Sequence, residues 1–165
     1  MRMARRTKRA LAYGIVFNMI LAALAISGAA FYVVHRPPFL EIRDSASGRV
    51  RGRWPLEKNG GFAVEFIHSV HQSPVRENFR TEGRTIMPDS VRFSSFGAGM
   101  QSDLEEGQTL TRDGDAMVIA GFSAAFRELN YIVGTVSDHL LYVNGETVSL
   151  RDLCGRNAHI SIRVR

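Results

Sequence analysis

Apolar and polar positions alternate with a period of two over much of the chain from residue 39 onward. The segment Ile160-Ser161-Ile162-Arg163-Val164 shows the alternation without interruption. Successive side chains of a β-strand point to opposite faces, so this period predicts strands with one buried face. Ten segments fit a strand: residues 39–43, 50–54, 62–68, 75–80, 91–96, 116–120, 131–133, 140–143, 147–150 and 160–164.

Two Asn-Gly pairs lie between these segments. Asn59-Gly60 separates the second segment from the third, and Asn144-Gly145 separates residues 140–143 from 147–150. Because Asn-Gly accepts positive φ, both pairs predict hairpin turns. Residues 101–115 are polar and rich in turn formers, which indicates a long surface loop. Only residues 123–129 and 149–154 are candidates for short helical turns, and the first of these segments could equally be a strand. We therefore expect an all-β domain over residues 39–165, a single antiparallel β-sandwich or a small barrel.

The N-terminal part has a different pattern. Residues 10–34 form an apolar run of 25 residues without a charge, and five basic residues lie within residues 1–9. About 20 helical residues cross a hydrocarbon core of about 30 Å, so the run predicts one N-terminal transmembrane helix. The basic segment favours a cytoplasmic N-terminus. Residues 35–38, with Pro37-Pro38, then form a short extended spacer.

A cleavable signal peptide is the alternative, because Gly28 and Ala30 stand at plausible −3 and −1 positions. The apolar segment of a signal peptide is about 7–15 residues long, and this run is longer, which favours an uncleaved anchor. Both interpretations export the domain. We expect a single-pass protein of the bacterial inner membrane with a periplasmic C-terminal domain.

The charge distribution changes the meaning of the overall charge of +5. Residues 1–34 carry five basic and no acidic residues, so residues 35–165 are neutral. A neutral domain without a basic stripe does not suit nucleic acid, which we exclude as a partner. Cys154 is the only cysteine, so it forms no internal disulfide, and we interpret it as a small buried residue rather than a nucleophile.

Residues 65–77 hold the densest group of chemically useful side chains. By strand parity His68 shares the core-facing side with Phe66, where an imidazole needs hydrogen-bond partners. The hydroxyl of Ser69 or Ser73 and the carboxylate of Glu77, on the strand after Pro74, can supply them if the segment folds back as a corner. The group is then either a structural polar network at that corner or a binding site formed by His68, Ser69 and Glu77.

Other chemistry has weaker support in the sequence. A two-His, one-carboxylate metal site of His68, His71 and Glu77 would require a turn, because residues three apart on a strand point to opposite sides. Gly97 and Gly99 allow close approach to a ligand or another chain, but they lack the third glycine and the lysine of a phosphate loop. No nucleophile elbow occurs. We expect no enzyme activity, no cofactor and no metal.

The motifs His68-Ser69-Val70, Ser73-Pro74-Val75 and Glu77, followed by Gly97-Ala98-Gly99, resemble a family of small exported bacterial proteins of unassigned function. The resemblance covers roughly residues 39–164, although His71 stands where many relatives would have an acidic residue. It implies a companion of TAXI-type TRAP solute transporters that contacts the permease or the periplasmic solute-binding protein. The alternative is a stand-alone exported β domain that binds a small ligand through His68, Ser69 and Glu77.

Overall fold

The structure, a computed structural model, describes residues 18–27, 37–57, 60–69, 72–94 and 103–165. Its contacts divide the chain into two units, Met1–Arg36 and Pro37–Arg165, which are described separately. In the first unit residues 18–27 are helical. The other residues of the predicted 10–34 membrane helix lie outside the described part. No helix within the described residues is both long and apolar enough to cross a bilayer.

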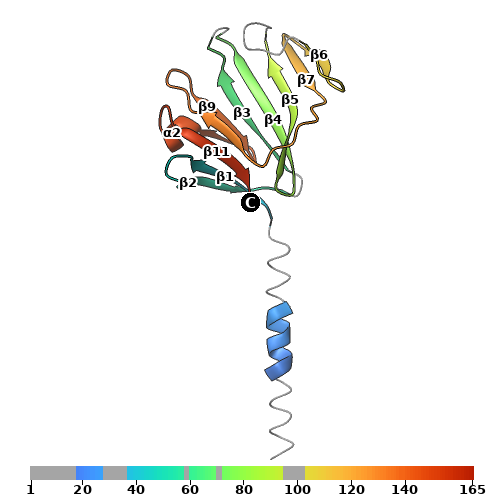
Figure 1. Cartoon of the computed structure of the whole chain (residues 1–165), viewed down its shortest axis with the longest axis vertical. Coiled ribbons are helices and arrows are strands. Elements are labelled where there is room, and N and C mark those ends of the chain that lie inside the picture. Colours follow the sequence, from blue (N-terminus) through green and yellow to red (C-terminus); the bar gives the residue numbers. More distant parts are fainter. Residues whose placement is uncertain (1–17, 28–36, 58–59, 70–71, 95–102) are drawn as a thin grey trace, which may run out of the picture. The chain divides into compact units, whose positions relative to one another are not determined.

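The unit Pro37–Arg165 is built from two antiparallel sheets (Figure 1). The four-stranded sheet has the order β2-β1-β11-β8, and the seven-stranded sheet has the order β10-β9-β3-β4-β5-β7-β6. The strands are β1 Phe39–Asp44, β2 Val50–Pro55, β3 Gly61–Ile67, β4 Pro74–Glu82, β5 Thr85–Phe93, β6 Thr109–Asp113, β7 Ala116–Ala120, β8 Leu129–Ile132, β9 His139–Val143, β10 Glu146–Ser149 and β11 His159–Val164; the short helix α2 is Leu150–Cys154.

The main core lies between the two sheets. Apolar residues on the inner faces of the central strands are fully buried, including Leu40 and Ile42 of β1, Ile162 of β11, Val64 of β3 and Leu141 of β9. These residues have the parity that the period-two pattern assigns to the inner faces. The predicted all-β class is confirmed, and the two separate sheets make the domain a β-sandwich rather than a barrel.

One predicted hairpin is confirmed and the other is wrong. Asn144 and Gly145 have φ angles of 51° and 77°, and they join β9 to β10 with Val143 opposite Glu146. The segment at Asn59-Gly60, in contrast, connects β2 and β3, which belong to different sheets. The strands on either side of this Asn-Gly sequence are not hydrogen-bonded to each other, because β2 pairs with β1 and β3 lies between β9 and β4.

Local predictions with little apolar patterning also needed correction. The expected loop over residues 101–115 contains β6, whose five residues are all exposed and therefore give no burial period. Of the two alternatives for residues 123–129, the helical turn is wrong: Phe126 forms a β-bridge with Ile86, and β8 begins at Leu129. The helical turn within residues 149–154 is confirmed as α2, where the Ser149 hydroxyl caps the helix by accepting a hydrogen bond from the Asp152 N–H.

A second, smaller core extends along the seven-stranded sheet. Val75, Phe93 and Ile119 of β4, β5 and β7 are buried together, with Phe66 and Phe122 packed against them. Between this cluster and the main core, the edge strand β8 of the four-stranded sheet faces β4 and β5. The space between these strands holds the candidate site.

Candidate functional site: a groove between the sheets

An open groove with a volume of about 420 Å³ lies where β8 faces β4 and β5. Its walls combine apolar and polar groups from both sheets and from the segments before β6 and β8: Glu77, Phe79, Pro88, Val91, Gln108, Phe122, Phe126, Leu129 and Tyr131. This volume and this mixture of aromatic and polar groups fall within the range of small-molecule sites. The chemistry of the groove depends on how Glu77 and Tyr131 are held.

Glu77 points toward the interior of the sandwich. It lies opposite Val64 of β3 and Val91 of β5, and Val64 is fully buried on the inner face. The Tyr131 hydroxyl, on β8 of the other sheet, donates a hydrogen bond of 2.6 Å to Oε2 of Glu77. This bond joins the two sheets at the wall of the groove.

Burial favours the neutral forms of both groups. It raises the pKa of the Glu77 carboxyl, and the hydrogen bond from Tyr131 offsets only part of that rise. Burial also raises the pKa of the Tyr131 hydroxyl, and the negative charge of Glu77 and the hydrogen bond to it add to the increase. The pair therefore offers a ligand a hydrogen-bonding carboxyl that gains a proton more easily than an exposed glutamate.

His139 stands beside this pair at the start of β9. Its ring stacks on Phe66 with centroids 5.2 Å apart, and it meets the edge of the Tyr131 ring at 6.1 Å. Nδ1 of His139 accepts a hydrogen bond of 3.2 Å from the Gly134 N–H. Burial lowers the pKa of His139; the nearby Asp138 carboxylate opposes this change and Arg151 adds to it. Burial therefore favours the neutral form of the imidazole.

The structure places most of the predicted site residues at a hairpin turn between β3 and β4. The His68 N–H donates to the Ser73 carbonyl at 2.9 Å, and the Gln72 N–H donates to the His68 carbonyl at the same distance. Ser69 and Pro74 are exposed, while His68 and Ser73 are partly buried. The chain thus folds back between β3 and β4, within the segment 68–77 where a corner was predicted. His71, Gly97 and Gly99 lie outside the described residues.

The pairing register separates Glu77 from the turn. Glu77 lies opposite Val64, four residues before His68, which corresponds to about 13 Å along the strand. The carboxylate meets Tyr131 in the groove, and the structure thus divides the predicted His68, Ser69 and Glu77 group between two places. Within the described residues, no group of three or more His, Cys, Asp or Glu side chains is arranged to hold a metal ion.

Sequence reasoning missed Tyr131 as the hydrogen-bond partner of Glu77, and it missed His139, whose ring contacts Phe66 and Tyr131. The parity argument used for His68 applies equally to His139, which shares the inward side of β9 with Leu141 and Val143. Tyr131 gave a weaker signal, because β8 has only four residues and its pairing with β11 cannot be deduced from local sequence. Cys154 is partly buried against the main core, and burial raises the pKa of its thiol.

The fold and groove define an antiparallel β-sandwich domain with a polar pair set into an opening between its sheets. The chain belongs to the DUF1850 family, a domain of unknown function, whose match covers residues 62–150. That range includes Glu77, Tyr131 and His139, so the groove lies largely within the family domain. The expected membership of an uncharacterised family is confirmed at this level. No curated protein and no solved structure matches the chain.

Proposed function

We propose that the protein is a membrane-anchored accessory subunit of a TAXI-type TRAP solute transporter, whose exported β domain contacts the permease or the solute-binding protein. The observation that carries this proposal is the short connection between the apolar run and the sandwich. Val34 ends the run and Phe39 begins β1, five residues later. Five residues extend to at most about 18 Å, so an anchored domain reaches only partners close to the bilayer.

Other observations support this proposal. Residues 18–27, in the middle of the apolar run, are helical, which agrees with a membrane helix. The motifs at residues 68–77 carry the resemblance to transporter companions; Ser69 and Pro74 are exposed at the turn, and Glu77 lines the groove. Exposed polar residues beside a partly apolar opening suit recognition of another protein.

The test is a pull-down of the full chain, tagged at its C-terminus through a flexible linker, from native membranes in mild detergent. We expect a multi-pass permease or its solute-binding protein in the eluate, and an intact bait mass that includes residues 1–34. A bait recovered without either protein would contradict the accessory role. A bait truncated near Ala30 would contradict the anchor.

A matched pair of variants locates the contact. Glu77→Ala changes the groove, whereas Glu82→Ala changes an exposed residue at the far end of the same strand. We expect the first variant to weaken recovery of the partner and the second to leave it unchanged, with similar melting temperatures for both. A large drop in the melting temperature of Glu77→Ala alone would assign Glu77 a structural role instead.

Binding of a small solute in the groove is the second candidate function. The specific observation that favours it is the volume of about 420 Å³ beside a carboxyl whose pKa is raised by burial. Native mass spectrometry of the protein purified from its own cells would reveal a retained small molecule. Loss of that molecule in Glu77→Ala, but not in Glu82→Ala, would place it in the groove, and a bare chain in all three samples would contradict this function.

A further inference from the structure

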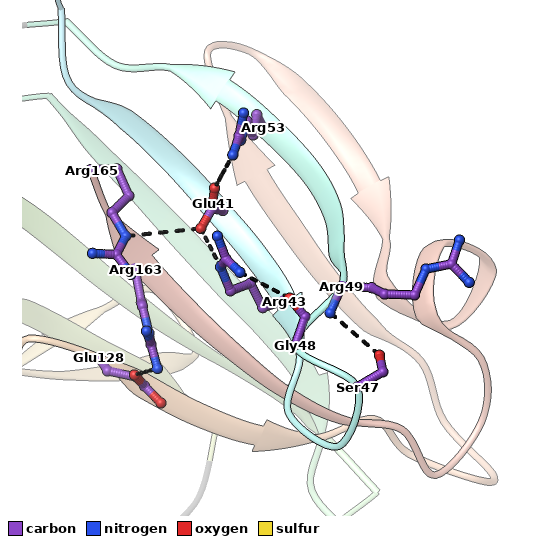
Figure 2. Close-up of polar contacts among 9 residues, drawn as sticks. All are labelled: Glu41, Arg43, Ser47, Gly48, Arg49, Arg53, Glu128, Arg163 and Arg165. Carbon is purple, nitrogen blue, oxygen red and sulfur yellow. Dashed lines mark hydrogen bonds and ion pairs between the residues drawn. The ribbon is translucent and has the colours of Figure 1, made fainter.

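Four arginines gather on the outer face of the four-stranded sheet (Figure 2). Arg43 lies on β1, Arg53 on β2, and Arg163 and Arg165 at the end of β11. We call this set the arginine face. The register brings the arginines together, because Glu41 of β1 lies opposite Arg53 on one side and Arg163 on the other.

One buried carboxylate organises the arginine face. Nε of Arg43 lies 2.5 Å from Oε1 of Glu41, Nη2 of Arg53 lies 2.7 Å from Oε2, and Nε of Arg165 lies 3.9 Å from Oε1. The side chain of Glu41 is 1% exposed. Arg163 forms a separate ion pair with Glu128. The arginines thus hide the Glu41 charge and themselves form the surface above it.

The guanidinium groups remain accessible to a ligand. Exposed fractions of the four side chains run from 30% for Arg43 to 56% for Arg53. Each guanidinium has five N–H donors. The contacts with Glu41, Glu128 and the Gly48 carbonyl, which accepts from Nη1 of Arg43, use only some of them, and of the Arg163 donors Nε is buried. Planar guanidinium donors bind phosphate oxygens well, often in pairs, so the face has the chemistry of a phosphate-binding surface.

The covalent chain limits how far this face can be from a membrane anchor. Phe39 and Arg165 exchange two backbone hydrogen bonds of 2.9 Å, so the end of β11 lies beside the first residue of β1. Phe39 follows the apolar run by five residues, or at most about 18 Å. If residues 10–34 are the anchor proposed above, Arg165 cannot lie far from the lipid headgroups.

We propose that the arginine face binds the phosphates of anionic phospholipid headgroups next to the anchor. Charge complementarity supports this occupant, and so does the arrangement of the face. The arginines are spread over three neighbouring strands, spaced about 4.8 Å apart, on an open sheet surface. Such a surface suits a layer of headgroups better than one enclosed anion, and basic residues near an anionic bilayer gain binding energy additively.

The test maps arginine reactivity in the full chain, reconstituted in nanodiscs. One sample contains phosphatidylcholine alone and the other contains one part in three of phosphatidylglycerol. An arginine-selective dicarbonyl reagent is applied, and peptide mass spectrometry gives the modification rate at each site. We expect Arg53 and Arg165 to react about fivefold more slowly in the anionic discs, with the difference removed by high salt. Arg80, exposed on β4, is the matched control and should react equally in both.

Equal rates for Arg53 and Arg165 in the two lipids would overturn the proposal. A soluble source of the same chemistry is tested by adding inorganic phosphate to the phosphatidylcholine discs. Protection there that equals the protection in anionic discs would assign the face to a free anion and overturn the lipid assignment. The variant Arg165→Gln should lower the protection of Arg53 in anionic discs, whereas Arg80→Gln should not.

This experiment tests the membrane anchor and the lipid-binding role of the arginine face independently. Copurification of the intact chain with the discs tests the anchor without reference to arginine reactivity. A chain that does not enter the discs contradicts the anchor, and the same mapping is then made with anionic and neutral vesicles added to the full chain. Protection of Arg53 by anionic vesicles alone would still support the lipid-binding face, and no protection would overturn it.

Discussion

Glu41 and Glu77 are two glutamates removed from water in opposite ways. Glu41 lies on the outer face of the four-stranded sheet under a cover of arginines, and hydrogen bonds from Arg43 and Arg53 outweigh its burial and lower its pKa. Glu77 lies on the inner face of the seven-stranded sheet, where its hydrogen-bond partner is the neutral Tyr131 hydroxyl and burial raises its pKa. Burial favours protonation of both, and the neighbouring cations decide the outcome.

The comparison shows what each region is built to hold. The Glu41 region holds a fixed negative charge, which in turn fixes the positions of several arginines. The groove holds hydrogen-bonding groups without a cationic partner among the described residues, and burial shifts the pKa values of Glu77 and Tyr131 in the direction that favours their neutral forms. The outer face of the four-stranded sheet therefore suits contact with charged groups, and the groove suits contact with polar, uncharged groups.

The largest effect is expected from Glu41→Gln. The change leaves Arg43 and Arg53 without their anionic partner, so we expect a loss of about 2 kcal/mol in the free energy of unfolding at pH 7. Because the pKa of Glu41 is lowered in the folded state, its stabilisation is present above the pKa of the unfolded chain and is lost as pH falls through the folded pKa. Thermal unfolding of the full chain in detergent measures the loss of stability at pH 7 and its decrease at pH 3.5. Glu82→Gln, an exposed control, should change the free energy of unfolding little. A loss similar to that of Glu41→Gln would show that burial beneath the arginines gives Glu41 no special role.

Tyr131→Phe should have the next largest effect. It removes the hydrogen bond to Glu77 and leaves a partly buried carboxylate, for a cost of about 1.5 kcal/mol at pH 7. The same change made in a Glu77→Gln background should cost less, because no charge is then left without its partner. Melting temperatures of the four proteins form a double-mutant cycle. Equal costs in the two backgrounds would show that the hydrogen bond is not energetically coupled to the charge.

Glu77→Gln should stabilise the protein slightly at pH 7, by up to about 1 kcal/mol, the opposite sign to Glu41→Gln. The raised pKa of Glu77 means that the folded state gains stability from this group as pH falls through the folded pKa toward the unfolded one. The advantage of the glutamine should therefore vanish below about pH 4. Melting curves between pH 4 and 8 would show it, and a destabilised variant at pH 7 would contradict the assigned environment.

The smallest effect concerns His139. Its pKa is lowered in the folded state, so stability is lost as pH falls below the pKa of the unfolded imidazole, near 6.5. We expect His139→Gln to reduce the loss of unfolding free energy between pH 7.5 and 5.5 by less than about 1 kcal/mol, which appears as a smaller shift in melting temperature. His159→Gln, an exposed control, should leave that change as it is in the original protein. Identical pH profiles for both variants would refute a protected imidazole.

The sequence was sufficient for the fold where one face of a strand is buried. The alternation at residues 160–164 corresponds to β11, and the Asn144-Gly145 turn is present as predicted. It was insufficient where no such contrast exists. The exposed β6 has no buried face, and β2 and β3 belong to different sheets, which depends on pairings far along the chain.

The candidate site shows the same division. Glu77 was selected from the sequence, but its partner lies 54 residues later on a strand of the other sheet. The alternation along a strand assigns each side chain to one face of its sheet. It does not identify the strand of the other sheet that lies opposite that side chain across the core. The grouping of His68, Ser69 and Glu77 rested on nearness in sequence, and the register of β3 and β4 places them four residues apart along the sheet.

The double hydrogen bond between Phe39 and Arg165 has a mechanical consequence. A pull transmitted through the residues before Phe39 enters the domain at β1, which is bonded to β2 on one side and to β11 on the other. A force along β1 then acts in shear on two rows of hydrogen bonds at once. At an edge strand the same force would break a single row, one bond after another. The point of attachment is therefore a mechanically resistant part of the domain.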